Sequence, residues 1–411
     1  MKKSTQETIK ESNIGLILKN IKENIYLSRI DLSKKTKLSR SAISNLVNFL
    51  IGEKIVFEGN KINSEQGKKP IELIFNKDLY YIIAINIGTD NITVAIANLL
   101  GEIIYISKKK NQPLNDKDHI IESIFTTVDE VLINSNINLE KIYLLSIGTH
   151  GVVNPLTKIV TRSPFFKNWN GINLINIFKE RYKKEVILEK YTDLAVVGEH
   201  WKSFNNLNNI IYLNIDYGIG AGIIINRKLI KGIKGTMGEI SHLPILKNNN
   251  FKRLEQNKLE LGLFESQVGI IGIVNKVKNE IKKSKKDSNI IIDKNIDNIN
   301  FDDICKYYNA PNNNIVKKII DNDIIKILAI GIVSIIALID TEVIVIGGLI
   351  TDLGEKFIDK LIKKIYCITP FKQEILVSKL KKDNSILGAI KYGIDYMDDI
   401  FYNRFLSILN K

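Results

Sequence analysis

The feature that most constrains the fold of this chain is a pattern of strands and a glycine turn that occurs twice. In the first copy, an apolar run ends at Ile87 and is followed by Gly88-Thr89 and two return strands. In the second copy, a similar run ends at Ile215 and is followed by a glycine turn over 216–222 and a return strand. Alternating helical and strand-like segments are typical of an α/β fold. The repetition therefore predicts a duplicated βββαβα sheet domain with a cleft between its two halves.

Apolar runs rich in Ile, Val and Leu define the strands of this domain, and apolar residues at helical spacing define its helices. The expected strands cover residues 79–87, 92–97, 103–106, 141–148, 186–189, 209–215, 223–226 and 343–346. The expected helices cover residues 118–133, 174–182, 193–201, 325–338, 357–365 and 385–396.

Residues 25–57, ahead of this domain, predict two short helices joined by a turn and then the start of a strand. Ser28 and Ser39 can cap these helices, because a serine hydroxyl accepts a free amide at a helix start. A further helix over 13–24 would pack behind them. The second of the two helices has one apolar face, formed by Ile43, Leu46, Val47 and Leu50. Its opposite face carries side chains that can reach phosphates and base edges in a major groove, namely Ser39, Arg40, Ser41, Ser44 and Asn45.

A two-stranded wing is expected to follow, with Lys68 and Lys69 near its tip and against a phosphate backbone. Residues 1–75 hold 14 Lys and Arg against 8 Asp and Glu. An ordinary helical hairpin with a solvated polar face is the alternative, and the wing argues against it. We therefore expect a DNA-binding module with double-stranded DNA as its partner.

Composition limits the other classes of function. The 411 residues allow two to three domains, and the net charge of +14 favours a polyanionic partner. Cys305 and Cys367 are too few for a disulfide framework or a cysteine zinc site. No signal-peptide pattern and no membrane-spanning apolar run is found, since charged residues interrupt the most apolar segment, 325–350. A soluble cytoplasmic protein is expected.

With these elements in view, the chain resembles repressors of the ROK family (repressors, open reading frames and kinases), of the xylose-repressor or N-acetylglucosamine-repressor type. The resemblance implies a two-lobed, duplicated domain of the actin and hexokinase type, which is ribonuclease H-like, behind an N-terminal winged helix-turn-helix. It implies a DNA-binding domain over 1–76 and a kinase-like domain over 77–411. The lobes would cover about 77–200 with the helix 385–396, and about 201–384. The matching segments are Gly67–Pro70, Ile87–Thr89, Gly148–Pro155, Gly218–Gly222, Gly235–His242 and Glu342–Gly348.

Three departures from the kinases of this family argue against phosphoryl transfer. The first phosphate loop has lost an aspartate and a glycine, and it begins with Asn86. Tyr191 stands at the position of the catalytic aspartate, and a phenol with an ordinary pKa of about 10 is a poor general base near neutral pH. Tyr217 replaces a small threonine of the second phosphate loop. We expect no catalytic residue, no cofactor and no enzyme activity.

The resemblance also locates a ligand site and removes a metal site. His242 matches a zinc-binding histidine of the family, but residues 243–265 contain no cysteine, so no metal is expected and a core histidine is the alternative. Glu239, His242 and Glu265 match residues that bind sugar hydroxyls. Phe165 and Lys190-Tyr191 replace polar sugar-binding residues, which leaves open whether the cleft binds an altered ligand or none. The candidate ligand-binding residues are Phe165, Lys190, Tyr191, Glu239, His242 and Glu265.

The resemblance leads to three functional hypotheses. The first is a homodimeric transcriptional repressor of carbohydrate-utilisation genes, released from its operator by a sugar-type inducer in the cleft. The second is an ATP-dependent sugar kinase with a DNA-binding arm. The third is a DNA-binding dimer that does not respond to a ligand.

Overall fold

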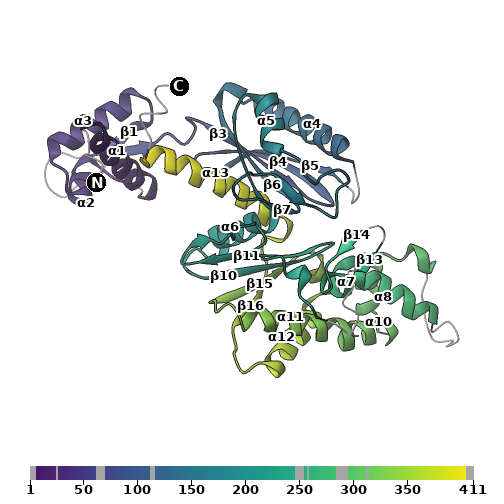
Figure 1. Cartoon of the computed structure of the whole chain (residues 1–411). Helices are drawn as coiled ribbons and strands as arrows, with labels where there is room; N and C mark the ends of the chain where they lie inside the picture. Colours follow the sequence, from purple (N-terminus) through teal and green to yellow (C-terminus); the bar gives the residue numbers. More distant parts are fainter. Residues whose placement is uncertain are drawn as a thin grey trace.

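The chain folds into a small N-terminal head and two larger lobes (Figure 1). The structure is a computed structural model, and it describes residues 6–24, 26–61, 70–111, 116–245, 254–256, 259–283, 295–311 and 314–403. Among the described helices, none combines the length and the apolar character needed to cross a lipid bilayer.

The head consists of three helices and a two-stranded antiparallel sheet. Its elements are α1 (Gln6–Glu23), α2 (Arg29–Thr36), α3 (Arg40–Gly52), β1 (Val56–Lys61) and β2 (Ile71–Phe75). The two expected caps are confirmed, because Ser28 accepts from the amide of Asp31 and Ser39 accepts from the amide of Ala42. Helix α1 begins seven residues before the expected start, because its first two turns are mostly polar and show no apolar periodicity.

Each lobe is built on a five-stranded mixed sheet, and the strands of the two sheets have the same order. The first sheet has the order β5-β4-β3-β6-β9, and the second has the order β12-β11-β10-β15-β16. The first contains β3 (Tyr81–Ile87), β4 (Asn91–Asn98), β5 (Ile103–Lys110), β6 (Ile142–Thr149) and β9 (Glu185–Lys190). The second contains β10 (Ile210–Ile215), β11 (Ile219–Ile225), β12 (Lys228–Leu229), β15 (Val343–Gly347) and β16 (Glu374–Val377). The expected duplication is confirmed.

The second glycine turn is shorter than the sequence pattern predicts. Gly220 and Gly222 lie inside strand β11, where Gly220 pairs with Asn214 and Gly222 pairs with Tyr212. The turn itself covers Asp216 to Gly218. The expectation of a turn over 216–222 was wrong, because glycines inside a strand and glycines in a turn look alike in the sequence.

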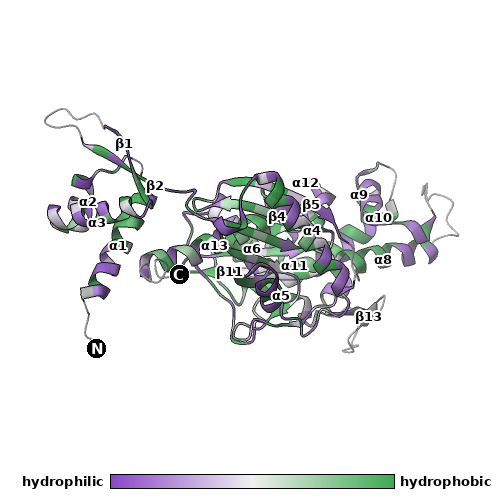
Figure 2. Ribbon diagram, turned by 90° about the horizontal axis from the view of Figure 1, so that it is seen from above, coloured by the Kyte–Doolittle hydropathy of each residue, from purple (hydrophilic) through white to green (hydrophobic). Residues whose placement is uncertain are grey.

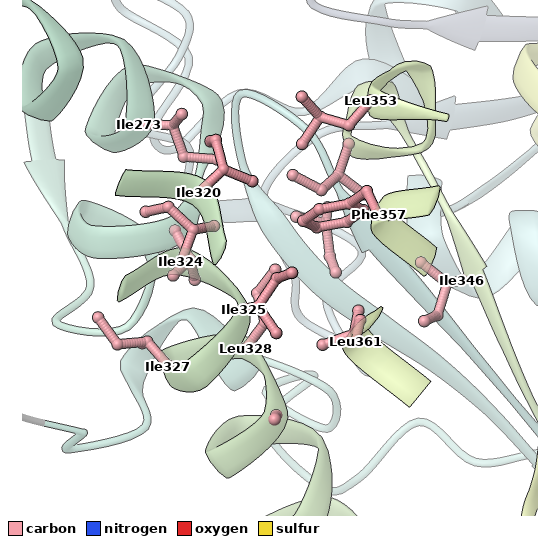
Figure 3. Packing of buried hydrophobic residues seen from close by; sticks show 14 of the residues in the cluster. Ile273, Ile320, Ile324, Ile325, Ile327, Leu328, Ile346, Leu353, Phe357 and Leu361 are labelled. Carbon is pink, nitrogen blue, oxygen red and sulfur yellow. The ribbon is translucent and has the colours of Figure 1, made fainter. Parts of the chain in front are cut away.

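Helices cover the sheets and bury their apolar faces. On the first sheet lie α4 (Lys117–Ser135) and α5 (Leu174–Tyr182). The second lobe has a larger cluster, whose packing between α8, α11, α12 and β15 is seen in Figure 3. Its helices are α7 (Glu265–Val268), α8 (Ile270–Lys283), α9 (Phe301–Asn309), α10 (Asn314–Ile319), the π-helical turn η4 (Ile320–Ile324), α11 (Ile325–Ile336) and α12 (Glu355–Ile368). The part of the chain that the structure describes also contains short elements: η1 (Leu139–Lys141), β7 (Val152–Val153), β8 (Val160–Arg162), η2 (Ile240–His242), β13 (Leu254–Gln256), β14 (Leu259–Leu261), η3 (Ile296–Asn298), η5 (Leu349–Leu353) and η6 (Lys381–Asp383).

Two helices join the lobes, because each follows the sheet of one lobe in the chain and packs on the sheet of the other. Helix α6 (Tyr191–Ser203) follows the last strand of the first sheet but packs on β10 and β11 of the second. Helix α13 (Asn384–Asn403) follows the last strand of the second sheet but packs on β3 and β6 of the first. The two helices also pack against each other at Gly198 and Gly388. A Cβ atom at Gly388 would lie 1.7 Å from the carbonyl oxygen of Leu194, so the backbones touch at this crossing.

Helix α13 also completes the core of the head, toward which it runs in Figure 1. Ile14 and Leu18 of α1 belong to the same buried cluster as Met397 and Phe401 of α13. The rings of Phe75 and Phe401 meet edge to face with centroids 6.2 Å apart. Figure 2 shows hydrophobic residues concentrated along the sheets and along the inner helices. The head and the first lobe therefore share one hydrophobic core.

Candidate functional site

The third helix of the head, α3, exposes a polar face. Its apolar side buries Ile43, Val47 and Leu50 against α1 and the wing strands, while Leu46 is half-buried. Four of the five predicted DNA-binding residues of this helix are exposed, namely Ser39, Arg40, Ser41 and Asn45. Asn48 is exposed on the same face and was not predicted. It could have been identified from its spacing, because it lies three residues after Asn45.

Ser44, the fifth predicted residue, has a partner within the head. It is half-buried, and its Oγ accepts a hydrogen bond of 3.2 Å from Nη1 of Arg29. Nη2 of Arg29 forms an ion pair of 2.9 Å with Oε1 of Glu58 in strand β1. Arg29 therefore connects α2, α3 and the wing. Lys68 and Lys69 lie outside the described residues.

The six predicted ligand-binding residues all line one pocket between the lobes, although they come from distant segments. These are Phe165, Lys190, Tyr191, Glu239, His242 and Glu265. The pocket contains about 600 Å³ of empty space when its open side is included. Its lining also contains His150 and Arg162, which were not predicted.

The acidic groups of the pocket already form hydrogen bonds or ion pairs with other groups of the chain. Glu265 is buried, and its two oxygens accept the amides of Ile219 at 2.8 Å and Gly262 at 3.3 Å. Burial raises the pKa of the Glu265 carboxyl to about 7, although these two amides act in the opposite direction. The ammonium of buried Lys190 donates to the carbonyl of Met237 at 2.5 Å and lies 3.5 Å from Glu239. Lys190 thus connects the first lobe to the second.

Arg162 and His242 form a second contact between the lobes. Nη1 of Arg162 lies 2.9 Å from Nε2 of His242, and Nη2 lies 2.8 Å from the carbonyl oxygen of Glu260. A guanidinium can only donate, so Nε2 of His242 is the acceptor in this pair. His242 is exposed rather than part of the core, so the expectation of a core histidine was wrong.

Two aromatic rings lie at the centre of the cleft. The rings of His150 and Tyr191 are stacked, with centroids 4.6 Å apart and planes 17° apart. Both residues line the pocket described above and also a second pocket, on the side of Asn86, Thr89 and Asp216. Burial raises the pKa of the Tyr191 phenol above its ordinary value and lowers the pKa of the His150 imidazole to about 4. The stacked rings therefore separate the two pockets as a neutral pair near pH 7.

Tyr191 is the first residue of α6, so this helix begins two residues before the expected start at Asp193. Asp193 is buried, with a carboxylate oxygen 3.8 Å from the ammonium of Lys190. Burial raises the pKa of Asp193 to about 7, and Lys190 acts in the opposite direction. The helix start was missed because Tyr191 and Thr192 follow directly from a strand without a side-chain cap.

The second pocket lies beside the turn that follows β3, and ion pairs cross its rim. Lys382 pairs with Asp90 at 2.6 Å, and Lys108 pairs with Asp383 at 2.6 Å. Burial raises the pKa of Asp216 on its floor to about 6. Among the residues that the structure describes, no cluster of His, Cys, Asp or Glu has an arrangement suited to a metal ion.

Two lobes whose sheets have the same strand order, with such a cleft between them, define a protein of the sugar-kinase-like class with the hexokinase type of fold. The ROK family model matches residues 82–393, so the chain belongs to the ROK family. A ROK family transcriptional regulator, described as a homologue of the E. coli Mlc protein, superposes with a TM-score of 0.73 at 20% identity and covers 98% of both chains. A ROK family glucokinase from Streptomyces griseus, solved with glucose and AMPPNP, superposes with a TM-score of 0.64 at 19% identity, covering 76% of this chain and 98% of its own.

Among relatives in sequence, repressors are prominent. The xylose repressor of Caldicellulosiruptor bescii is 27% identical over 394 residues, which are 95% of this chain and 97% of that protein. The xylose repressor of Bacillus subtilis is 33% identical over 246 residues, covering 58% of this chain and 62% of that protein. The first of these alignments includes the head as well as the lobes. The chain therefore resembles the transcriptional repressors of its family, and neither of these relatives is a kinase.

Proposed function

We propose that this chain is a transcriptional repressor that binds operator DNA through α3 and leaves it when a sugar-type ligand occupies the interlobe cleft. The observation that carries the proposal is the exposed polar face of α3 on a head whose core is completed by α13. Arg40, Ser41 and Asn45 have the chemistry for phosphates and base edges, and they lie in the first two turns of the helix. The xylose repressors that resemble the chain support the same function.

A continuous path of packed helices supports the response to a ligand. Helix α6 begins at Tyr191 in the pocket and packs along α13, which crosses it at Gly198 and Gly388. Helix α13 then reaches the head, where its Phe401 lies in the core beside α1. A ligand that binds one arrangement of the lobes more tightly than the other would shift the population of that arrangement. The head would move with α13.

We propose a homodimer as the DNA-binding form. Winged and simple helix-turn-helix dimers read two half-sites about 34 Å apart, so a small change in the angle of the lobes changes the fit of both heads. Lys68 and Lys69 would contact the backbone beside each half-site.

Substitution of Arg40 by alanine is expected to weaken operator binding by roughly 10- to 100-fold, because it removes a guanidinium that contacts phosphate or a base edge. The measurement is a fluorescence-anisotropy titration on the DNA upstream of the gene, at two salt concentrations. The control Lys141→Ala removes one exposed positive charge from the first lobe and should bind like the wild type. If the wild type showed no saturable, salt-sensitive binding, the DNA-binding proposal would be wrong.

Incubation with MgATP and a panel of hexoses and pentoses is expected to yield no sugar phosphate. The phenol of Tyr191 occupies the centre of the cleft between the two pockets and cannot serve as a carboxylate base. A coupled assay for ADP measures this, with an active sugar kinase as the positive control. Turnover above the background rate would identify an enzyme and would favour the kinase with a DNA-binding arm.

A further inference from the structure

Four charged side chains among the described residues line the ligand pocket: Arg162, Lys190, Glu239 and Glu265. Three of them are compensated within the protein. Lys190 and Glu239 face each other at 3.5 Å, and both oxygens of Glu265 accept backbone amides. These groups can contact a ligand, but they do not present an uncompensated charge to it.

Arg162 is different, because its two hydrogen bonds go to uncharged groups, although it lies near enough to Glu265 to lower the pKa of that carboxyl. Its Nη1 donates to the His242 imidazole, and its Nη2 donates to the Glu260 carbonyl. A guanidinium has five N–H donors in a planar fork, so these two bonds orient the group and leave other donors available. The side chain is half-buried in the lining of the pocket. A partly desolvated, oriented guanidinium is well suited to bind a carboxylate or a phosphate.

Besides Arg162, the first lobe contributes Lys190 and mainly aromatic groups to the pocket. The aromatic rings of His150, Phe165 and Tyr191 form much of its wall, and Phe165 is buried. Hydroxyl groups of a ligand would instead meet Glu239 of the second lobe, which is half-exposed beside Lys190. The pocket thus has a polar side with Glu239 and Lys190, an aromatic side, and the guanidinium of Arg162.

We propose that the ligand of this pocket is an anionic sugar, whose acidic group binds the guanidinium of Arg162 while its hydroxyl groups face Glu239. The inference rests on the proposed function, and it deepens it by naming the class of inducer. The acidic group is a carboxylate, as in an aldonic or uronic acid, or a phosphate monoester. Both would accept from the planar fork.

The position of Arg162 also connects ligand binding to the arrangement of the lobes. Arg162 ends strand β8 of the first lobe, whereas its partners lie in η2 and β14. An anion on the remaining donors would bind a guanidinium that these two interlobe hydrogen bonds orient, and only an arrangement of the lobes that keeps both bonds presents it in this way. The ligand would then bind the two arrangements unequally, as a response requires.

The test is isothermal titration calorimetry on the full chain with matched neutral and acidic sugars. The pairs are xylose with xylonate and glucose with glucuronate, and glucose 6-phosphate separates a phosphate from a carboxylate. At least one acid should bind roughly 10- to 100-fold more tightly than its neutral partner, the range expected for a charged hydrogen-bonded pair. Arg162→Gln should abolish this preference.

Two further variants make the result independent of folding effects. Arg162→Lys retains the charge without the fork and should bind the acid with intermediate affinity. Arg181→Gln changes an exposed arginine of α5, which pairs with Asp129 outside the pocket, and should bind like the wild type. The inference is overturned if neutral sugars bind as tightly as acids, if Arg162→Gln keeps the preference, or if no sugar of either kind binds. Operator binding by the same preparation shows separately whether the DNA-binding proposal stands.

Discussion

Replacement of Gly388 by alanine is expected to lower the free energy of unfolding by at least about 2 kcal/mol, an effect of overpacking at a helix crossing. The added methyl carbon would lie 1.7 Å from the carbonyl oxygen of Leu194 and 2.5 Å from its carbonyl carbon. Backbone atoms of α6 cannot move aside singly, because this helix packs on the second sheet along its length. The lobes would have to separate. Chemical denaturation followed by circular dichroism measures the change.

Gly52 offers a matched control for the same chemical change. It is the last residue of α3, and an added Cβ would meet no atom within 4 Å. Gly52→Ala is expected to change the free energy of unfolding by less than about 1 kcal/mol, since only the helix propensity is altered. Equal stability of the two alanine variants would contradict the crossing of α6 and α13 described above.

Replacement of Lys22 by methionine is expected to cost about 2–3 kcal/mol, because it leaves a largely buried carboxylate without its partner. Lys22 of α1 and Asp398 of α13 form an ion pair of 2.5 Å, and their side chains are 8% and 21% exposed. Methionine keeps most of the contact with the ring of Phe75, over which the ammonium lies at 5.1 Å. The loss is therefore mainly electrostatic. Urea denaturation at several pH values measures it.

The direction of the pH dependence follows from the pKa of Asp398. Burial raises this pKa above its ordinary value, and Lys22 acts in the opposite direction, so its removal raises the pKa further. A carboxyl with a raised pKa in the folded state favours folding at low pH, and this contribution is lost as the pH rises through that pKa. The deficit of Lys22→Met should thus be smaller near pH 5 than near pH 8. The double variant Lys22→Met, Asp398→Leu should recover much of the loss, and an unchanged deficit would contradict the ion pair.

The fold could be predicted from the sequence where one local pattern sufficed. The doubled strand pattern predicted both sheets except the edge strands β12 and β16 of the second, and Ser28 and Ser39 marked the starts of two helices in the head. What the sequence did not predict are contacts between distant segments. The crossing at Gly198 and Gly388 depends on two helices that each leave their own lobe, and a glycine within a helix has no local signature of such a partner.

In the candidate site, too, residue positions could be predicted from the sequence, whereas contacts between distant segments could not. Resemblance placed six ligand-binding candidates, and the structure brings them into one pocket. Arg162 and His150 were missed because nothing in the flanking residues reveals that a short strand or a tight turn faces the cleft. Ser44 has the chemistry of a groove contact, but whether Arg29 occupies it depends on how α2 packs against α3.

The closure of the head by α13 has a consequence for biosynthesis. Residues of α1 such as Ile14 and Leu18 leave the ribosome long before Met397 and Phe401, which complete their apolar environment. Until then, the nascent head exposes an apolar surface of the kind that chaperones bind. The head is translated first, but its core is complete only when nearly all of both lobes have been synthesised. Unfinished chains would therefore not bind operators.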